Sequence, residues 1–226
     1  MRPTRRFTPA AAARAALAAS VLLLAAAPWA SAQTADWRLR VGVGRVDFRE
    51  DVSLAVGGAT VPGASATLSD ENTLLAEIGY RFTPAWSLGL TLGVPPITDV
   101  DGSGAAAPFG RLGDVRYGPI ALTGQYQFNA GGALRPYVGA GAVYFMVLDE
   151  SDGAIAGFEV KSRLGSLVHV GAELALTPTL GLYVDVKKLY VKTRATGTLP
   201  ALGGAPVEAR VRLDPVVFSA GLSFDF

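Results

Sequence analysis

The feature that most constrains the fold of this chain is an alternation of apolar and small or polar residues with a period of two. Between residues 86 and 94, every even position is a large apolar residue and every odd position is Ser, Gly or Thr. A period of two places alternate side chains on opposite faces of a β-strand. The same pattern predicts eight strands, at residues 37–43, 74–82, 86–94, 120–128, 135–146, 168–176, 180–186 and 216–226. The Gly and Ala content of residues 135–146 leaves the facing of that strand open.

The links between these strands alternate strictly between short and long. Residues 83–85, 129–134 and 177–179 are short, and two of these links share a Thr-Pro pair. The long links are rich in Gly, Ala, Pro, Ser and Asp, and they span residues 47–71, 95–116, 147–161 and 195–209. Outer-membrane barrels have short periplasmic turns and long extracellular loops. The sequence therefore predicts an all-β protein, an eight-stranded antiparallel up-and-down transmembrane β-barrel with four long extracellular loops.

A soluble barrel of the lipocalin type is the alternative fold. That design places its apolar face inside and a charged face outside. Only 17% of this chain is charged, and its apolar face carries aromatic residues near the strand ends, such as Trp37, Trp86 and Phe128. Aromatic girdles at strand ends are typical of a membrane interface. The pattern favours the membrane barrel.

The N-terminus has the order of a secretory signal peptide. Four arginines lie within residues 1–14, an apolar run follows at 15–27, and the small residues Ala30, Ser31 and Ala32 come next. The apolar run is shorter than the roughly 20 residues that a transmembrane helix needs. We therefore expect a cleaved signal at residues 1–32 and a mature barrel at residues 33–226. An uncleaved anchor or a buried helix is the alternative for this segment.

Composition removes several classes of function. The chain has no cysteine, which excludes disulfides, thiolate zinc sites and a cysteine nucleophile. Beyond residue 14 the chain has 16 basic and 19 acidic side chains, so nucleic acid is not an expected partner. His169 is the one histidine, and residue 171, two positions along its strand, is a glycine. A serine hydrolase therefore requires a partner from a neighbouring strand. We predict no enzyme activity, no metal site and no cofactor.

Three segments resemble signature regions of the OmpW family of small outer-membrane barrels. They are residues 135–141 (RPYVGAG), 184–190 (VDVKKLY) and 211–218 (VRLDPVVF). The resemblance extends over the mature chain in order and spacing. It implies a barrel in the outer membrane of a Gram-negative cell, with a narrow apolar channel that passes small hydrophobic solutes. The alternative function is a structural or adhesive barrel with a closed lumen.

The long links suggest where such a channel opens. They contain more hydrophobic residues than solvated loops usually show. We predict an apolar entrance at Phe109, Ile155 and Phe158, together with Leu164, which stands where family members often have a tryptophan. The alternative is that these side chains only pack the loops against one another.

Charged side chains on the inward parity predict a polar plug. An arginine facing lipid costs roughly 2–4 kcal/mol at mid-bilayer, so these residues are expected to face the lumen. The interior of an eight-stranded barrel is just wide enough for side chains to fill. The predicted plug, in the periplasmic half, consists of Arg38, Arg40, Glu77, Arg81, Gln125, Glu173 and Asp185.

A plug of this kind would send an apolar solute sideways into the membrane. This lateral exit is partly suggested by the family resemblance. Glycine and proline weaken the hydrogen bonding of a strand, and they occur near strand ends at residues 95–96, 118–119 and 215. We place the expected weak points of the wall there.

The last strand ends on an assembly signal. Its outward parity holds Leu222, Phe224 and the terminal Phe226. This arrangement resembles the signal read by the barrel-assembly machinery. The expected partners are therefore that machinery, outer-membrane lipid and small hydrophobic solutes.

Overall fold

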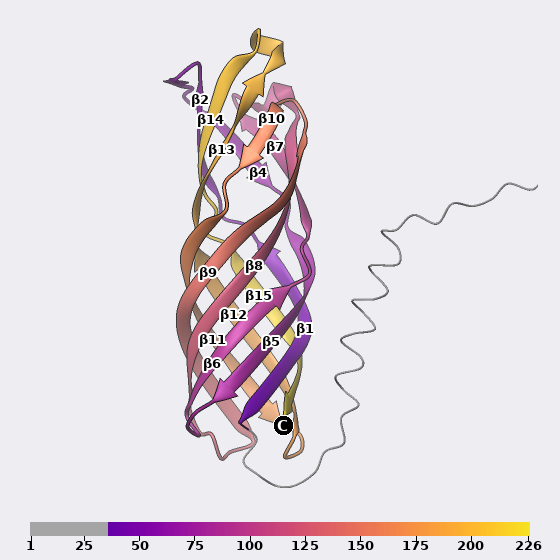
Figure 1. The fold of residues 1–226 in the computed structure, drawn as a ribbon, viewed down its shortest axis with the longest axis vertical. Coiled ribbons are helices and arrows are strands. Elements are labelled where there is room, and N and C mark those ends of the chain that lie inside the picture. The colour runs from indigo at the N-terminus through magenta and orange to yellow at the C-terminus, as the bar shows by residue number, and fades with distance from the viewer. Residues whose placement is uncertain (1–35) are drawn as a thin grey trace, which may run out of the picture. The chain divides into compact units, whose positions relative to one another are not determined.

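The computed structural model describes residues 36–226, which form an antiparallel barrel (Figure 1). The predicted signal at residues 1–32 lies outside the described residues. Two short 3-10 helices, η2 (Ala107–Phe109) and η3 (Pro200–Leu202), accompany the strands. In residues 36–226, neither helix is long and apolar enough to cross a membrane. The eight wall strands are β1 (Trp37–Asp47), β5 (Glu71–Arg81), β6 (Trp86–Gly93), β8 (Arg111–Gln127), β9 (Leu134–Asp152), β11 (Arg163–Ala175), β12 (Leu180–Tyr190) and β15 (Val216–Asp225).

Antiparallel ladders join these strands into a ring. Each wall strand pairs with the next wall strand along the chain. The first strand, β1, also pairs with the last, β15, from Arg38 opposite Asp225 to Asp47 opposite Val216. The ring therefore has no free edge. This confirms the predicted fold, and each of the eight predicted segments coincides with part of one strand, with at most its last residue beyond the strand's end.

The two Thr-Pro turns at one end of the barrel share their hydrogen bonds. The hydroxyl of Thr83 accepts the N–H of Trp86 at 2.9 Å, and the hydroxyl of Thr177 accepts the N–H of Leu180 at 2.9 Å. A threonine hydroxyl thus replaces a main-chain acceptor at the same place in each turn. The common sequence produces a common turn.

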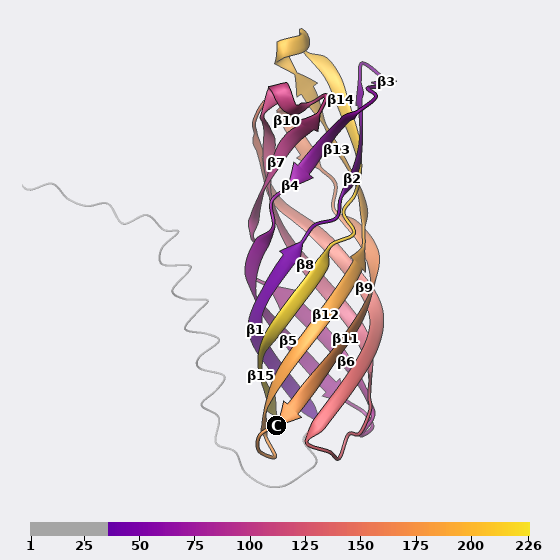
Figure 2. The same ribbon diagram turned by 180° about the vertical axis from the view of Figure 1, so that it is seen from behind.

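The long links contain more regular structure than the sequence predicts. Each carries strands that continue the wall beyond the eight-stranded ring (Figures 1 and 2). Their runs are short and rich in Gly and Ala, so the alternating pattern that marks the other strands is weak. They are β2 (Asp51–Val56), β3 (Ala59–Thr60), β4 (Ala64–Leu68), β7 (Ile97–Gly104), β10 (Ala156–Val160), β13 (Lys192–Leu199) and β14 (Ala205–Arg212).

Beyond the ring, the wall divides into two sheets. One consists of β4, β7 and the ends of β8 and β9, and the other has the order β10-β13-β14-β2-β3. In the described part of the chain, no ladder joins β2 to β4 or β9 to β10. We call these two boundaries the β2/β4 seam and the β9/β10 seam. They are where the long-link end differs from the closed ring.

The two faces of the ring have the chemistry that its sequence parity predicts. On β12, Val184 and Val186 are exposed on the outside, whereas Tyr183 and Asp185 are buried inside. Exposed aromatic residues gather near the short turns, where the rings of Trp37 and Tyr80 lie 5.0 Å apart. An apolar outer face with aromatic residues at its border fits a lipid environment.

Candidate functional site in the barrel lumen

The lumen at the short-turn end is filled by charged side chains centred on Glu173. This residue is 1% exposed. One of its carboxylate oxygens lies 3.2 Å from a guanidinium nitrogen of Arg38 and 3.2 Å from one of Arg40. The other oxygen lies 3.5 Å from Arg135. A carboxylate buried with this many cationic donors is compensated for its lost hydration.

Arg40 connects this centre to the opposite wall. Its guanidinium donates to Glu77 at 2.9 Å and to the side-chain oxygen of Gln125 at 3.0 Å. Gln125 in turn donates to Glu77, also at 2.9 Å. The guanidinium also lies 4.4 Å from the ring centroid of Tyr137, within the range of a cation–π contact. Arg40 on β1 therefore contacts side chains from β5, β8, β9 and β11.

Asp225 closes the network next to the C-terminus. Its carboxylate lies 2.7 Å from Arg38 and 3.0 Å from Arg81. Arg135 is 3.7 Å away. The inward parity of the last strand holds this acid while the outward parity holds Phe224 and Phe226. One strand thus supplies both the end of the charged network and the apolar outer surface.

The other end of the network is built on Asp185. Its two oxygens lie 2.8 Å from Nδ1 of His169 and 2.7 Å from Nζ of Lys187. The imidazole fits because residue 139 is glycine, and a Cβ there would overlap Nε2 of His169. His169 thus meets a carboxylate from a neighbouring strand, and among residues 36–226 no serine hydroxyl is hydrogen-bonded to it.

The structure places all seven residues of the predicted plug in the lumen, with Arg81 partly exposed. Sequence reasoning omitted Arg135, Lys187 and Asp225 from this set, and it considered His169 only as a possible hydrolase residue that lacks a partner on its own strand. The inward parity of their strands was the available signal for Lys187 and Asp225. We call the whole set the lumen network: Arg38, Arg40, Glu77, Arg81, Gln125, Arg135, His169, Glu173, Asp185, Lys187 and Asp225.

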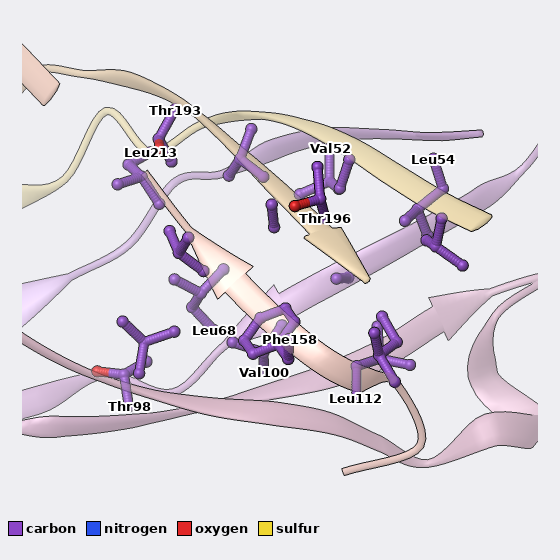
Figure 3. A pocket seen from close by; sticks show the side chains of 18 of the residues that line it. Val52, Leu54, Leu68, Thr98, Val100, Leu112, Phe158, Thr193, Thr196 and Leu213 are labelled. Atoms are coloured by element: carbon purple, nitrogen blue, oxygen red, sulfur yellow. The ribbon is translucent and has the colours of Figure 1, made fainter. Parts of the chain in front are cut away.

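An apolar cavity of about 60 Å³ lies between the two sheets at the long-link end (Figure 3). Its walls are almost entirely aliphatic and aromatic, with Thr98, Thr193 and Thr196 as the polar exceptions. Tyr117 and Phe145 also line it, and their rings stack with centroids 4.8 Å apart. The inward side chains are Asp185 and Lys187 on β12 and then Thr193 and Ala195 on β13. The same stretch of wall therefore lines first the lumen network and then the cavity.

The predicted entrance residues do not all lie at this cavity. Ile155 and Phe158 line it and are buried. Phe109 packs against the hydrophobic core without lining the cavity. Leu164 is 72% exposed on the outer face of β11 and does not line the cavity. Leu164 has the same parity as Val168 and Val170, which are also exposed, and this parity directs it away from the lumen.

Carboxylates bridge both seams in place of a main-chain ladder. At the β2/β4 seam, Glu50 accepts the N–H of Leu68 at 3.1 Å and Asp70 accepts the N–H of Phe48 at 3.3 Å. At the β9/β10 seam, Asp152 accepts the N–H of Phe158 at 2.8 Å. Asp152 also accepts the N–H of Gly157 at 2.9 Å, and these two backbone donors hold its pKa below the usual aspartate range.

The described part of the chain offers no group of three or more His, Cys, Asp or Glu side chains placed to hold a metal ion. The closed ring, its apolar outer surface and its charged lumen define a small transmembrane β-barrel. Residues 33–226 match the model of the OmpW family, and the chain belongs to that family. It is thus a protein of the Gram-negative outer membrane.

Two relatives and one solved structure are similar to this chain over nearly their whole length. The dibenzothiophene metabolism operon protein PahQ of Pseudomonas aeruginosa is 34% identical, with 90% of this chain and 93% of PahQ covered. The outer membrane protein AlkL of Ectopseudomonas oleovorans is 31% identical over 93% of this chain and 94% of AlkL. The crystal structure of the outer membrane protein OprG from P. aeruginosa superposes with a TM-score of 0.80 at 25% identity, covering 86% of this chain and 97% of OprG.

Proposed function

We propose that this barrel is a passive channel through which small hydrophobic molecules enter the outer membrane. The observation that carries the proposal is the cavity between the two sheets, whose lining is apolar apart from three threonines. Similarity to a protein of a dibenzothiophene metabolism operon supports an apolar substrate class. A narrow apolar cavity suits an extended or flat apolar molecule, because such a molecule gains free energy when it leaves water for apolar surroundings.

In this proposal the long-link end faces the cell exterior and the short turns face the periplasm. That orientation follows from the asymmetry of link lengths in outer-membrane barrels. Ile155 and Phe158 then form part of the apolar entrance, because both line the cavity from the link between β9 and β11. The alternative, a structural or adhesive barrel, predicts no solute flux through this cavity.

The lumen network acts as the plug below the cavity. Glu173 and its arginine partners are already hydrogen-bonded, so a hydrocarbon gains nothing by contact with them. Separating these ion pairs to open a passage would leave buried charges without partners, which costs several kcal/mol. The solute is therefore expected to leave through the wall above the plug.

We place the lateral exit at the β2/β4 seam. The ladder between β1 and β5 ends with Val46 opposite Glu71. Proline-containing junctions flank the gap on both sides, with Pro95 and Pro96 beyond β6 and Pro215 before β15. At the β9/β10 seam, by contrast, β9 continues without a break from Leu134 to Asp152. Among residues 36–226, no main-chain ladder crosses the β2/β4 seam, and neither β2 nor β4 belongs to a strand that continues from the ring.

Uptake by liposomes tests the channel directly. Replacing Phe158 with Asp puts a charge into the cavity, and a buried unpaired charge is expected to reduce uptake of an apolar aromatic solute by about tenfold or more. The matched control is Leu202→Asp, which adds the same charge at an exposed position in η3. Wild-type uptake no faster than that of protein-free liposomes would favour the structural barrel. Equal uptake by the wild type and both folded variants would mean that the solute does not pass through this cavity.

Crosslinking tests the exit. The chain has no cysteine, so Phe48→Cys with Asp70→Cys can be joined across the β2/β4 seam by a short, reducible thiol reagent. Crosslinking should reduce uptake to the level of protein-free liposomes, and reduction should restore it. The control pair, Val147→Cys with Ser162→Cys, spans the β9/β10 seam and should transport in both states. Uninterrupted uptake through a crosslinked β2/β4 seam would exclude that exit while leaving the channel itself intact.

A further inference from the structure

A groove on the outer surface of the barrel is lined by five cationic side chains. It lies on β2, β13, β14 and the start of β11, on the opposite face of the wall from the cavity and away from the lumen network. Asp51, Ser53, Thr193 and Val211 complete its lining. We call the five cations the basic groove: Arg163, Lys192, Arg194, Arg210 and Arg212.

The cations in this groove stand opposite one another. Lys192 pairs in register with Arg212, and Arg194 pairs with Arg210. Like charges directly opposite on neighbouring strands repel and destabilise the sheet. Lysine and arginine often protect exposed sheet edges, but β13 and β14 are inner strands of their sheet. Edge protection therefore does not account for them.

Acidic neighbours compensate the groove only weakly. Glu208 lies 3.7 Å from Arg194 and 3.8 Å from Arg210, and both arginines are more than half exposed. Among residues 36–226, Arg163, Lys192 and Arg212 are in no ion pair, although Asp51 stands opposite Arg212 in register. The groove thus has an excess of positive charge that an external anion can neutralise.

Its height on the wall places the groove at the membrane surface. Outward positions run from Leu180 to Tyr190 on β12, about 33 Å of strand, or about 25 Å of height at the usual tilt. That height equals the apolar band of a typical outer-membrane barrel. Lys192 and Arg194 are the next outward positions along the same wall. Their charged ends therefore lie at the level of lipid headgroups.

We propose that the basic groove binds the phosphate groups of a diphosphorylated lipid in the adjoining leaflet. Arginine and lysine form strong charge-assisted hydrogen bonds to phosphate. The pairs Lys192/Arg212 and Arg194/Arg210 are two residues apart on each strand, about 7 Å, so each pair can meet one phosphate. With the orientation proposed above, the leaflet is the outer one, whose lipid A carries two phosphates on its headgroup.

Native mass spectrometry of the folded barrel in mixed micelles tests this assignment. Wild-type barrel should retain diphosphorylated lipid A, and Lys192→Gln with Arg212→Gln should lower its affinity about tenfold through loss of two charge-assisted contacts. The matched control is Arg111→Gln with Arg116→Gln, which removes the same charge from exposed positions on β8. The control should stay within about twofold of wild type, since screened distant charges contribute little. If the first pair does not give a heat-modifiable barrel, Arg194→Gln with Arg210→Gln replaces it.

Three comparisons separate the ligand sources. Dephosphorylated lipid A and phosphatidylglycerol should both be retained much less than diphosphorylated lipid A. Inorganic phosphate at the same concentration should not compete. Equal retention of either comparison lipid, tight binding of inorganic phosphate, or an equal loss in the control variant would overturn the proposal. None of these outcomes depends on solute uptake through the cavity.

Discussion

The two halves of the lumen are built on the same wall but are filled in opposite ways. At the short-turn end, four acidic side chains and five lysine or arginine side chains occupy the interior as a connected network. At the long-link end, the same wall surrounds an apolar cavity. On the wall formed by β12 and β13, the change occurs between Lys187 and Leu189, which are both buried.

The backbone around each half suits its contents. A closed ring of ladders holds the charged half, where a local opening would separate ion pairs that have no other partner. The apolar half lies between two sheets, and its seams are bridged by side-chain carboxylates. An apolar cavity tolerates small wall movements, because its contacts are individually weak and carry no direction. The lumen network and the apolar cavity therefore differ in two ways. They differ in polarity, and only the lumen network is enclosed by a continuous ring of main-chain ladders.

The largest effect is expected from breaking the centre of the charged half. Glu173→Ala leaves Arg38, Arg40 and Arg135 buried without a shared acceptor. The free energy of unfolding of the barrel should therefore fall by about 5 kcal/mol. Equilibrium urea unfolding in phospholipid micelles measures this. The control Glu208→Ala removes an acid from the exposed outer sheet and should change stability by about 1 kcal/mol or less. Similar losses in the two variants would contradict a stabilising network.

A second test compares a leucine that lines the cavity with a leucine that is packed in the hydrophobic core beside it. Leu112 lines the cavity, whereas Leu167 is 1% exposed and lies outside the cavity lining. Replacing Leu167 with Ala should lower the free energy of unfolding by about 4 kcal/mol. Replacing Leu112 with Ala should lower it by only about 2–3 kcal/mol, because the cavity wall is already incompletely packed. The same urea titrations measure both. An equal or larger loss at Leu112 would mean that this half is packed as tightly as the core.

Period-two alternation, together with the alternation of short and long links, was sufficient to predict the ring and its eight strands. It also predicted the direction of their side chains, except at residues 135–146, whose facing it left open. Arg40 and Glu77 illustrate why parity also located the candidate site. Each is a charged residue on the small-residue face of a strand whose other face is apolar, and the cost of facing lipid leaves one direction. Lys187 obeys the same rule, so its omission was a failure to apply the rule and not a lack of signal.

The cavity and the seams had no comparable signal. Leu164 and Phe158 are both large apolar residues in or next to a long link, but one faces outward and the other lines the cavity. Parity on β11 directs Leu164 outward, whereas the direction of Phe158 depends on the strand β10, whose register with β13 is irregular between Ala156 and Glu159. Local sequence does not encode such a register. Phe158 also fits only because residue 113 on β8 is glycine. A Cβ at that position would overlap the ring of Phe158. That contact is determined only by the assembled sheets.

The smallest effect concerns one carboxylate at the seam of the apolar half. Asp152 is bound by the N–H groups of Gly157 and Phe158, which lower its pKa. A lowered folded-state pKa means that the stabilisation is present above the ordinary aspartate pKa and is lost as pH falls through the lower folded value. The amide resonances of both residues should therefore titrate together at a pH below the usual aspartate range. Asp152→Asn should abolish that titration and increase hydrogen exchange at Phe158 across neutral pH, with the ring unaffected. Titration at or above the ordinary aspartate pKa would show that the β9/β10 seam does not depend on this carboxylate.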